Sequence, residues 1–382
     1  MTDYYGPRLR PAAAGLGHSA PAGAHGKFSG VAPLPRIARF AHSPQIRAEW
    51  PWALLRPPTN TSRLDPMLTE TARSKGLRKF IPQPDPYAER YGRFTLTARD
   101  VEILELVHRY RYLEARHIRA LVGGSDQQIT RRLQGLFHNK YLGRYARRER
   151  MRLELDPGSP LIAYGLELKG ARAIERHRGA AAVPIGVVPE PVRWKKDYTR
   201  RTDWFLEHHL MVSNFRCVLE RALRETPDTE LMTWNQGKDT WFRVPIPGGR
   251  KTFVRVAPDA YFVLRQGRQV RHFFLEADRS TEEHRRLEAK FIGYWRHVQV
   301  PPDLEGGHGR RRVNVLFVTT GERRMSSVIE TLRLLPKLNR DALGGRGLFW
   351  FCCEPRYDLA ASESVLGPIW RSATETALSL RT

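Results

Sequence analysis

The sequence predicts an α/β protein in which a small helical domain with a β-hairpin precedes a larger domain of helices packed on a mixed sheet. Two observations predict this class. Apolar residues recur at helical spacing through residues 97–138, and a strand-like pattern follows over residues 142–166. Beyond residue 194 the predicted elements follow one another in the order α-β-β-β-α-β-α-β. We therefore expect two folded domains of different architecture.

The first two helices of the smaller domain have clear boundaries. The first is predicted to begin at Thr97-x-x-Asp100, where Asp takes the position that Glu or Gln usually holds in a capping box. Its apolar face starts at Val101 and recurs every three to four residues. The second helix is predicted from about Glu114 to Val122, and it ends at Gly123-Gly124.

The third helix begins at Ser125-x-x-Gln128, which has the sequence of a capping box. Its predicted core side comprises Ile129, Leu133, Leu136 and Phe137. Three short helices with a glycine turn before the third are typical of a helix-turn-helix. Strands at 142–155 and 161–166 form the hairpin expected of a wing, and a helix at about 167–177 closes the domain. The sequence thus predicts a winged helix-turn-helix.

The charge of the chain indicates a polyanionic partner. Its 64 Lys and Arg against 40 Asp and Glu leave a formal net charge of +24, which indicates nucleic acid or an anionic membrane surface. Between Arg131 and Arg152 there are eight basic residues and a single acid, Glu149. We predict double-stranded DNA contacts from Gln127, Gln128, Arg131, Arg132, Gln134, Lys140, Arg144, Arg147, Arg148, Arg150 and Arg152.

In this hypothesis the third helix lies in the major groove, where Gln127, Arg131 and Gln134 face base edges. The arginines of the wing hold phosphates. The alternative is a winged helix that contacts protein, with its arginines merely solvated. RNA binding is allowed by charge alone, but no RNA-module motif is present.

The remaining segments are predicted from composition. Residues 1–93 are rich in Pro and Gly, which indicates a disordered or extended basic arm. The predicted winged helix covers residues 94–179, a linker covers 180–193, and the α/β domain covers 194–382. The three cysteines have no Cys-x-x-Cys spacing, and no apolar run reaches the length of a membrane span. We expect a cytoplasmic protein without a membrane partner.

Carboxylates gather on two consecutive strands of the predicted α/β domain. Asp259 follows Pro258 within one predicted strand, and Glu276-Ala277-Asp278 ends the next. Because strand residues two apart share a face, Glu276 and Asp278 should project together. If the strands pair, Asp259 and Glu276 converge on one hard cation such as Mg²⁺.

Two further residues complete this hypothetical site. Lys290 borders the sheet-facing side of the next helix, from which it could reach a scissile phosphate as a point charge. Glu207, on the first helix of the domain, is an outlying candidate. Phosphodiester hydrolysis needs such groups, since a metal activates water and positive charge stabilises the leaving oxygen. The alternative is a turn Asp, a surface Glu–Arg pair and a Lys that only packs its stem.

This pattern resembles the core of the PD-(D/E)XK nucleases. It departs from that family at one place, because the usual Glu-x-Lys is Glu276-Ala277-Asp278 here. The resemblance implies that Lys290 would replace the missing strand lysine, and that the fold could equally be retained for binding without catalysis.

A resemblance to the replication-relaxation family covers residues from about 95 to 350. Its most specific part is the string Glu276-Ala277-Asp278-Arg279-Ser280-Thr281-Glu282, which follows Pro258-Asp259 and precedes Lys290 and Tyr294. The resemblance implies a protein of plasmids and other mobile elements that acts in replication, DNA relaxation or transfer.

Three functional hypotheses follow. The first is a DNA-binding protein of a mobile element that acts through its winged helix. The second is a Mg²⁺-dependent endonuclease that uses Asp259 and Glu276 as metal ligands. The third is an adaptor that recruits a relaxase or replication protein. The sequence leaves the oligomeric state and the DNA site open.

Overall fold

The computed structural model describes residues 94–146, 162–180, 203–245, 253–280, 282–299, 313–335 and 347–381, together with residues 84, 192 and 194. All of them belong to one compact unit, Arg73–Thr382. The predicted arm over residues 1–93 and the predicted linker lie almost wholly outside the described residues. The predicted domain boundaries therefore stay predictions.

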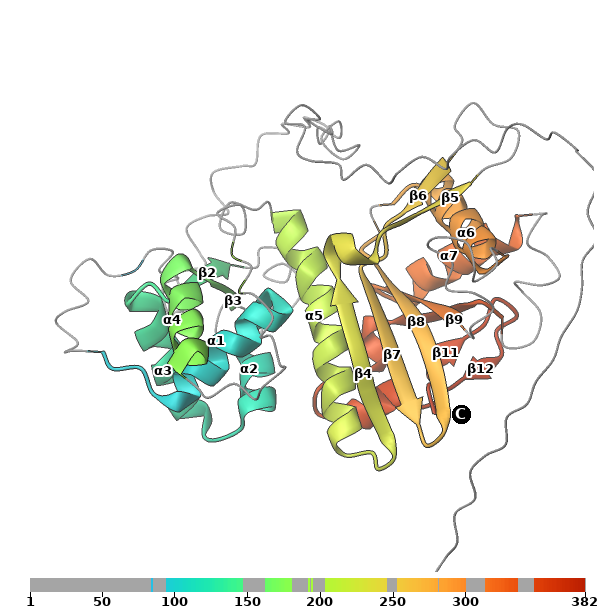
Figure 1. Cartoon of the computed structure of the whole chain (residues 1–382). Coiled ribbons are helices and arrows are strands. Elements are labelled where there is room, and N and C mark those ends of the chain that lie inside the picture. The colour runs from blue at the N-terminus through green and yellow to red at the C-terminus, as the bar shows by residue number, and fades with distance from the viewer. Residues whose placement is uncertain are drawn as a thin grey trace, which may run out of the picture. The chain divides into compact units, whose positions relative to one another are not determined.

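The N-terminal part of this unit combines four helices with a small sheet (Figure 1). Its elements are α1 (Ala98–Tyr110), β1 (Tyr112–Glu114), α2 (Ala115–Val122), α3 (Asp126–His138), β2 (Leu142–Ala146), β3 (Ile162–Leu166) and α4 (Leu168–Ala180). The three strands form an antiparallel sheet in the order β1-β3-β2. The helices lie in the segments predicted for them, and β2 and β3 lie within the two predicted hairpin strands. The rest of the predicted hairpin, residues 147–161, lies outside the described residues. The short strand β1 was not predicted.

The helix starts follow from local hydrogen bonds. At α1 the capping box is complete, because the Thr97 side chain accepts from the Asp100 backbone and the Asp100 side chain accepts from the Thr97 backbone. At α3 the Ser125 hydroxyl accepts from the Gln128 backbone N–H at 3.3 Å, but the return bond is not seen among the described residues. The prediction of a full capping box was therefore wrong there. The Gln128 side chain is exposed, so water can satisfy its amide.

The turn between α2 and α3 requires its glycines. Gly123 has φ +73° and Gly124 has φ +90°, a region that residues with a Cβ rarely adopt. The predicted core side of α3 is buried as expected, through Ile129, Leu133, Leu136 and Phe137. Sequence periodicity and turn chemistry therefore account for this part of the fold.

The C-terminal part is a mixed α/β structure built on a seven-stranded sheet. Its elements are α5 (Asp203–Arg224), β4 (Thr229–Gln236), β5 (Phe242–Pro245), β6 (Phe253–Val256), β7 (Ala260–Gln266), β8 (Gln269–Asp278), α6 (His284–Gln299), β9 (Val313–Thr319), α7 (Glu322–Arg333), β10 (Phe349–Cys353), β11 (Trp370–Arg371) and β12 (Ala377–Leu378). The strand order is β12-β11-β10-β9-β8-β7-β4. Strands β8, β9 and β10 run parallel and the other neighbours antiparallel. The predicted mixed α/β class is confirmed.

The helices cover both faces of this sheet (Figure 1). One cluster packs α5 against Phe273, Leu275 and their neighbours, and the other packs α6 and α7 against Phe274 and the opposite face. Because side chains alternate along a strand, Glu276 of β8 shares the face of Phe274. The sheet therefore turns Glu276 and Asp278 toward α6 and α7.

The prediction that Asp259 lies within one strand was wrong. The strand is interrupted at residues 257–259. As a result, β6 pairs with β5 in a separate two-stranded sheet, and β7 pairs with β8. Pro258 lacks the N–H that a strand ladder needs. Asp259 instead donates its backbone N–H to Leu275 O at 3.0 Å. Asp259 consequently precedes a strand rather than lying within one.

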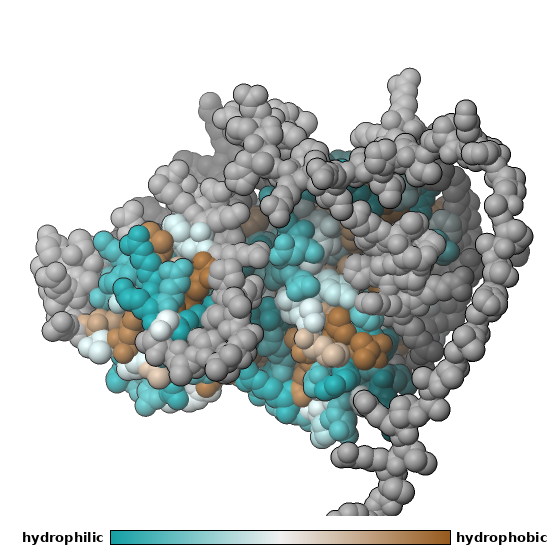
Figure 2. All heavy atoms as spheres, viewed as in Figure 1, coloured by the Kyte–Doolittle hydropathy of each residue, from teal (hydrophilic) through white to brown (hydrophobic). Residues whose placement is uncertain are grey.

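Helix α5 joins the N-terminal part to the sheet. The Ser213 hydroxyl donates to Tyr110 O at 3.0 Å, and the Arg224 guanidinium donates to Leu121 O at 3.1 Å. The described surface on one face mixes hydrophilic regions with smaller hydrophobic ones (Figure 2). Within the described ranges, no helix is both long and apolar enough to cross a membrane.

Candidate functional site

The exposed face of α3 carries the polar residues that the sequence predicts for DNA contact. Gln127, Gln128, Arg131 and Gln134 are all exposed, while the opposite side of the helix is buried in the core. Lys140, two residues after the helix, is also exposed. These side chains can therefore meet a ligand without any rearrangement of the core.

Two predicted DNA-contacting arginines are instead engaged within the protein. The Arg132 guanidinium donates from Nε to Asp100 Oδ1 at 2.7 Å and also contacts Asp100 Oδ2. Arg144 lies over the Phe137 ring, 4.3 Å from its centroid. Arg132 thus contributes to folding, and Arg144 is partly held by an aromatic ring. Arg147, Arg148, Arg150 and Arg152 lie outside the described residues.

A second group of polar residues meets at the end of β8, between α5 and α6. The Lys290 ammonium on α6 donates to Glu276 Oε2 at 2.8 Å and forms an ion pair with Glu282 at 2.8 Å. The Tyr294 hydroxyl donates to Glu276 Oε1 at 2.5 Å. The structure therefore brings Glu276 and Lys290 together as the sequence hypothesis requires.

Asp259 joins the same group from the turn before β7. Its Oδ1 lies 2.8 Å from His208 Nε2 on α5, and its Oδ2 accepts from the Ala277 N–H at 2.8 Å. Residues from four separate segments thus surround one end of β8. We call Asp259, Glu276, Lys290, His208 and Tyr294 the carboxylate cluster.

Burial and the charges of neighbouring groups shift the pKa values of residues in this cluster. Burial raises the pKa of Glu276 to about 7, and the neighbouring Asp259 and Glu282 carboxylates add to the rise although Lys290 opposes it. Burial alone would lower the pKa of Lys290, but the Glu276 and Glu282 carboxylates raise it above its ordinary value. Lys290 therefore remains a fixed positive charge beside Glu276.

The His208–Asp259 pair behaves as an ion pair. Burial would lower the pKa of His208, but the Asp259 carboxylate outweighs it and raises that pKa. Burial would in turn raise the pKa of Asp259, but His208 and the Ala277 N–H lower it. Each partner therefore favours the charged form of the other.

The two remaining predicted catalytic residues are Asp278 and Glu207. Asp278 accepts from Arg324 Nε of α7 at 2.7 Å and from the Ser280 N–H at 3.0 Å, so it belongs to a separate ion pair. Glu207 is buried on α5, directly before His208. Asp278 therefore bonds to residues outside the carboxylate cluster.

His208 is the residue that the sequence analysis missed. A pair of adjacent histidines on a helix usually has no special meaning, and its partner Asp259 is distant in the chain. One signal was available, because His208 directly follows Glu207, which the sequence analysis names as an outlying candidate. Sequence spacing alone does not say which side of α5 faces the turn before β7.

The cluster does not have the form of a metal site. Each of the four carboxylate oxygens of Asp259 and Glu276 already accepts a hydrogen bond from the protein. Among the described residues, no group of three His, Cys, Asp or Glu could hold a metal ion. A Mg²⁺ ion would have to displace Lys290 or His208. The residues as arranged do not fit the ion, so the predicted Mg²⁺ ligands remain a sequence prediction.

Comparison with known proteins gives one match. The family model described as replication-relaxation matches residues 104–303, from within α1 to just beyond α6. No curated protein and no solved structure matches the chain. The matched range contains α3 and the whole carboxylate cluster.

Proposed function

The chain belongs to the replication-relaxation family, and on that premise we propose that it binds double-stranded DNA in the replication or relaxation of a plasmid or other mobile element. Family membership supports an interaction with DNA or with the replication machinery in general. The net charge of +24 supports a polyanionic partner. The more specific claim, that DNA is bound by one helix, rests on the surface of α3.

We assign the DNA contact to a winged helix-turn-helix formed by α1, α2, α3 and the β2–β3 hairpin. The polar face of α3 carries this proposal. Gln127, Arg131 and Gln134 are exposed there at helical spacing, with amide and guanidinium groups that can pair with base edges. Lys140 and the wing arginines would hold the flanking phosphates.

Replacing Arg131 with alanine should weaken duplex binding by about tenfold or more, since it removes one base-edge contact. Fluorescence anisotropy with a labelled duplex would measure this. Wild-type affinity should also fall by about 0.9 logarithmic units per phosphate contact for each decade of salt. Arg268→Ala removes the same charge at an exposed turn and serves as the matched control. Wild-type affinity that stays constant with salt would contradict the proposal.

A second candidate function is phosphodiester hydrolysis at the carboxylate cluster. The convergence of Asp259, Glu276 and Lys290 from separate segments favours it. In this proposal Lys290 supplies positive charge to the phosphate, and the Asp259–His208 pair orients water. This second proposal corresponds to the PD-(D/E)XK nuclease core that the sequence resembles.

Under the second proposal, Asp259→Asn should reduce nicking of supercoiled DNA by about hundredfold while duplex binding stays unchanged. The assay would be run with Mg²⁺ and again with a chelator. Glu283→Gln changes an exposed carboxylate at the start of α6 and should cleave like the wild type. Equal nicking by wild type and Asp259→Asn would reject a catalytic role for this cluster.

A further inference from the structure

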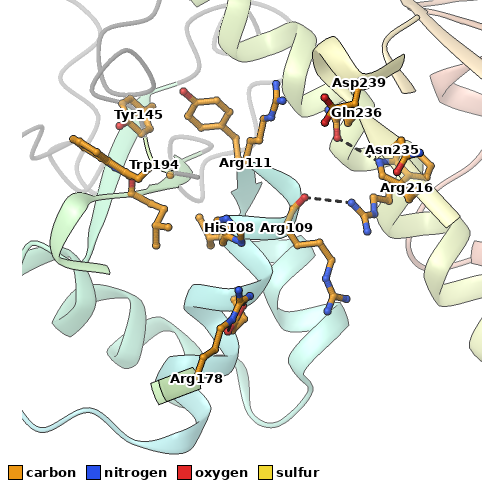
Figure 3. Close-up of a pocket in the computed structure, with 16 residues that line it drawn as sticks. His108, Arg109, Arg111, Tyr145, Arg178, Trp194, Arg216, Asn235, Gln236 and Asp239 are labelled. Atoms are coloured by element: carbon orange, nitrogen blue, oxygen red, sulfur yellow. Dashed lines mark hydrogen bonds and ion pairs between the residues drawn. The ribbon is translucent and has the colours of Figure 1, made fainter. Parts of the chain in front are cut away.

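A cavity separate from both sites lies between the end of α1 and the start of the sheet. Its volume is about 330 Å³, which is in the range of small-ligand sites. Figure 3 shows Tyr145 and Trp194 on one side, Asn235 and Gln236 on the other, and Arg111 between them. The predicted DNA-contacting face of α3 does not line it.

Two ion pairs build the walls of this cavity. Arg178 donates to Glu105 from Nε at 2.7 Å and from Nη2 at 2.5 Å. Arg216 pairs with Glu220 at 2.7 Å and donates to Arg109 O at 3.2 Å. The Arg178 pair neutralises Glu105, and Asp239 is the other carboxylate that lines the cavity. Arg109 is exposed at the edge, so a cationic side chain lies at the opening.

The backbone at Arg111 is held in a rarely occupied conformation. Its φ of 70° and ψ of −51° are unfavourable for a residue with a Cβ, and such strain is often retained at functional sites. Gly237, with φ 83°, makes room for it. A Cβ at Gly237 would lie 2.7 Å from Arg111 Nη2. The fold therefore directs the Arg111 guanidinium into this space.

The other walls offer aromatic rings and an amide. Tyr112 and Tyr145 lie edge to face, 5.6 Å apart, and the Trp194 indole is fixed by its bond to Leu166 O at 2.9 Å. The Oε1 of Gln236 accepts from Trp234 at 3.4 Å. Its buried Nε2 has no hydrogen-bond partner in the part of the chain that the structure describes. An acceptor on a ligand would satisfy that amide.

The cavity lies next to the carboxylate cluster along α5. Arg111 Nη1 is 3.4 Å from His209 Nε2. The His209 ring is 5.9 Å from that of His208, which contacts Asp259. A group bound beside Arg111 would therefore be close to the cluster.

We propose that this cavity binds a nucleotide, with its phosphate on Arg111 and its base against the aromatic residues Tyr145 and Trp194. Guanidinium groups recognise phosphate, and aromatic faces stack bases without regard to sequence. The nucleotide is either free or part of a single DNA strand. This site is independent of duplex binding by α3.

The test measures binding of the full-length protein to a labelled oligothymidylate of about 12 nucleotides. Arg111→Gly removes the guanidinium while retaining a residue that tolerates the backbone angle. It should weaken binding by about tenfold or more. Arg268→Ala, an exposed control, should bind like the wild type.

Competition separates the two sources of the nucleotide. Displacement of the probe by 2′-deoxyadenosine 5′-monophosphate identifies a site for free nucleotides, whereas displacement by unlabelled oligonucleotide alone identifies a strand site. Either result supports the cavity when Arg111→Gly has lost affinity. The proposal is overturned if Arg111→Gly and Arg268→Ala bind the labelled oligothymidylate with equal affinity. It is also overturned if the wild type does not bind that oligonucleotide.

Discussion

Replacing Lys290 with methionine should lower the free energy of unfolding by about 3 kcal/mol at pH 8. The substitution leaves Glu276, whose side chain is 2% exposed, without its cation. Methionine has a similar length and fills the same space, so the loss reports charge rather than a cavity. Chemical denaturation monitored by circular dichroism would measure it. Lys238→Met, at an exposed position, should leave stability unchanged.

The loss in Lys290→Met should also depend on pH. In the wild type the pKa of Glu276 is already raised from 4.5 to about 7, so the folded state favours the protonated carboxyl. Without Lys290 that pKa should rise further. Stability is then retained at pH 5 and is lost as the pH increases through and beyond 7. A loss that is the same at pH 5 and pH 8 would contradict this explanation.

A second substitution isolates the charge interaction between Lys290 and Glu276. Glu276→Gln in the Lys290→Met background should restore most of the lost stability, because the amide is neutral and can still accept from the Tyr294 hydroxyl. If the double variant is as unstable as Lys290→Met, then packing rather than charge explains the loss.

Replacing Asp100 with alanine should lower the free energy of unfolding by about 3 kcal/mol. Asp100 is fully buried. Its Oδ2 accepts from the Thr97 backbone at 2.7 Å and from the Thr97 hydroxyl at 2.8 Å, and both oxygens bind Arg132. One substitution therefore removes the cap of α1 and the contact between α1 and α3.

Two further variants separate the contribution of the helix cap from that of the buried Asp100 network. Thr97→Ala removes the capping hydroxyl and should cost about 1 kcal/mol. Asp126→Ala makes the same substitution at an exposed first-turn residue of α3, whose side chain is 76% exposed, and should cost less than Asp100→Ala. Denaturation of all three proteins provides the comparison. If Asp126→Ala is as destabilising as Asp100→Ala, the buried network is not the source of the stability.

The stability variants also bear on function. Arg132 was a predicted DNA contact, yet its guanidinium is bound to Asp100. Weaker duplex binding by an Arg132 variant could therefore arise from a displaced α3. Arg131, which is exposed on the same helix, is the more direct probe of the proposed interface.

Much of the fold could be predicted because its signals are local. The apolar spacing of α3, the glycine turn before it and the capping pair at Thr97 lie within a few residues of one another. Strand β9 spans Val313–Thr319, and its apolar run is likewise a local signal. The break before β7 was missed although Pro258 was visible. A proline alone does not say whether a strand bends or ends.

In the candidate site, too, local features could be predicted from the sequence and long-range contacts could not. The sequence by itself determined its residue types, since the Pro-Asp and Glu-x-Asp motifs singled out Asp259 and Glu276, and helical spacing singled out Lys290. Only the tertiary structure decided the partners. His208 meets Asp259 across 51 residues, Arg132 meets Asp100 across 32, and Asp278 pairs with Arg324 rather than with the cluster. Periodicity reports which face of an element is buried, but the pairing of charges depends on how separate elements pack.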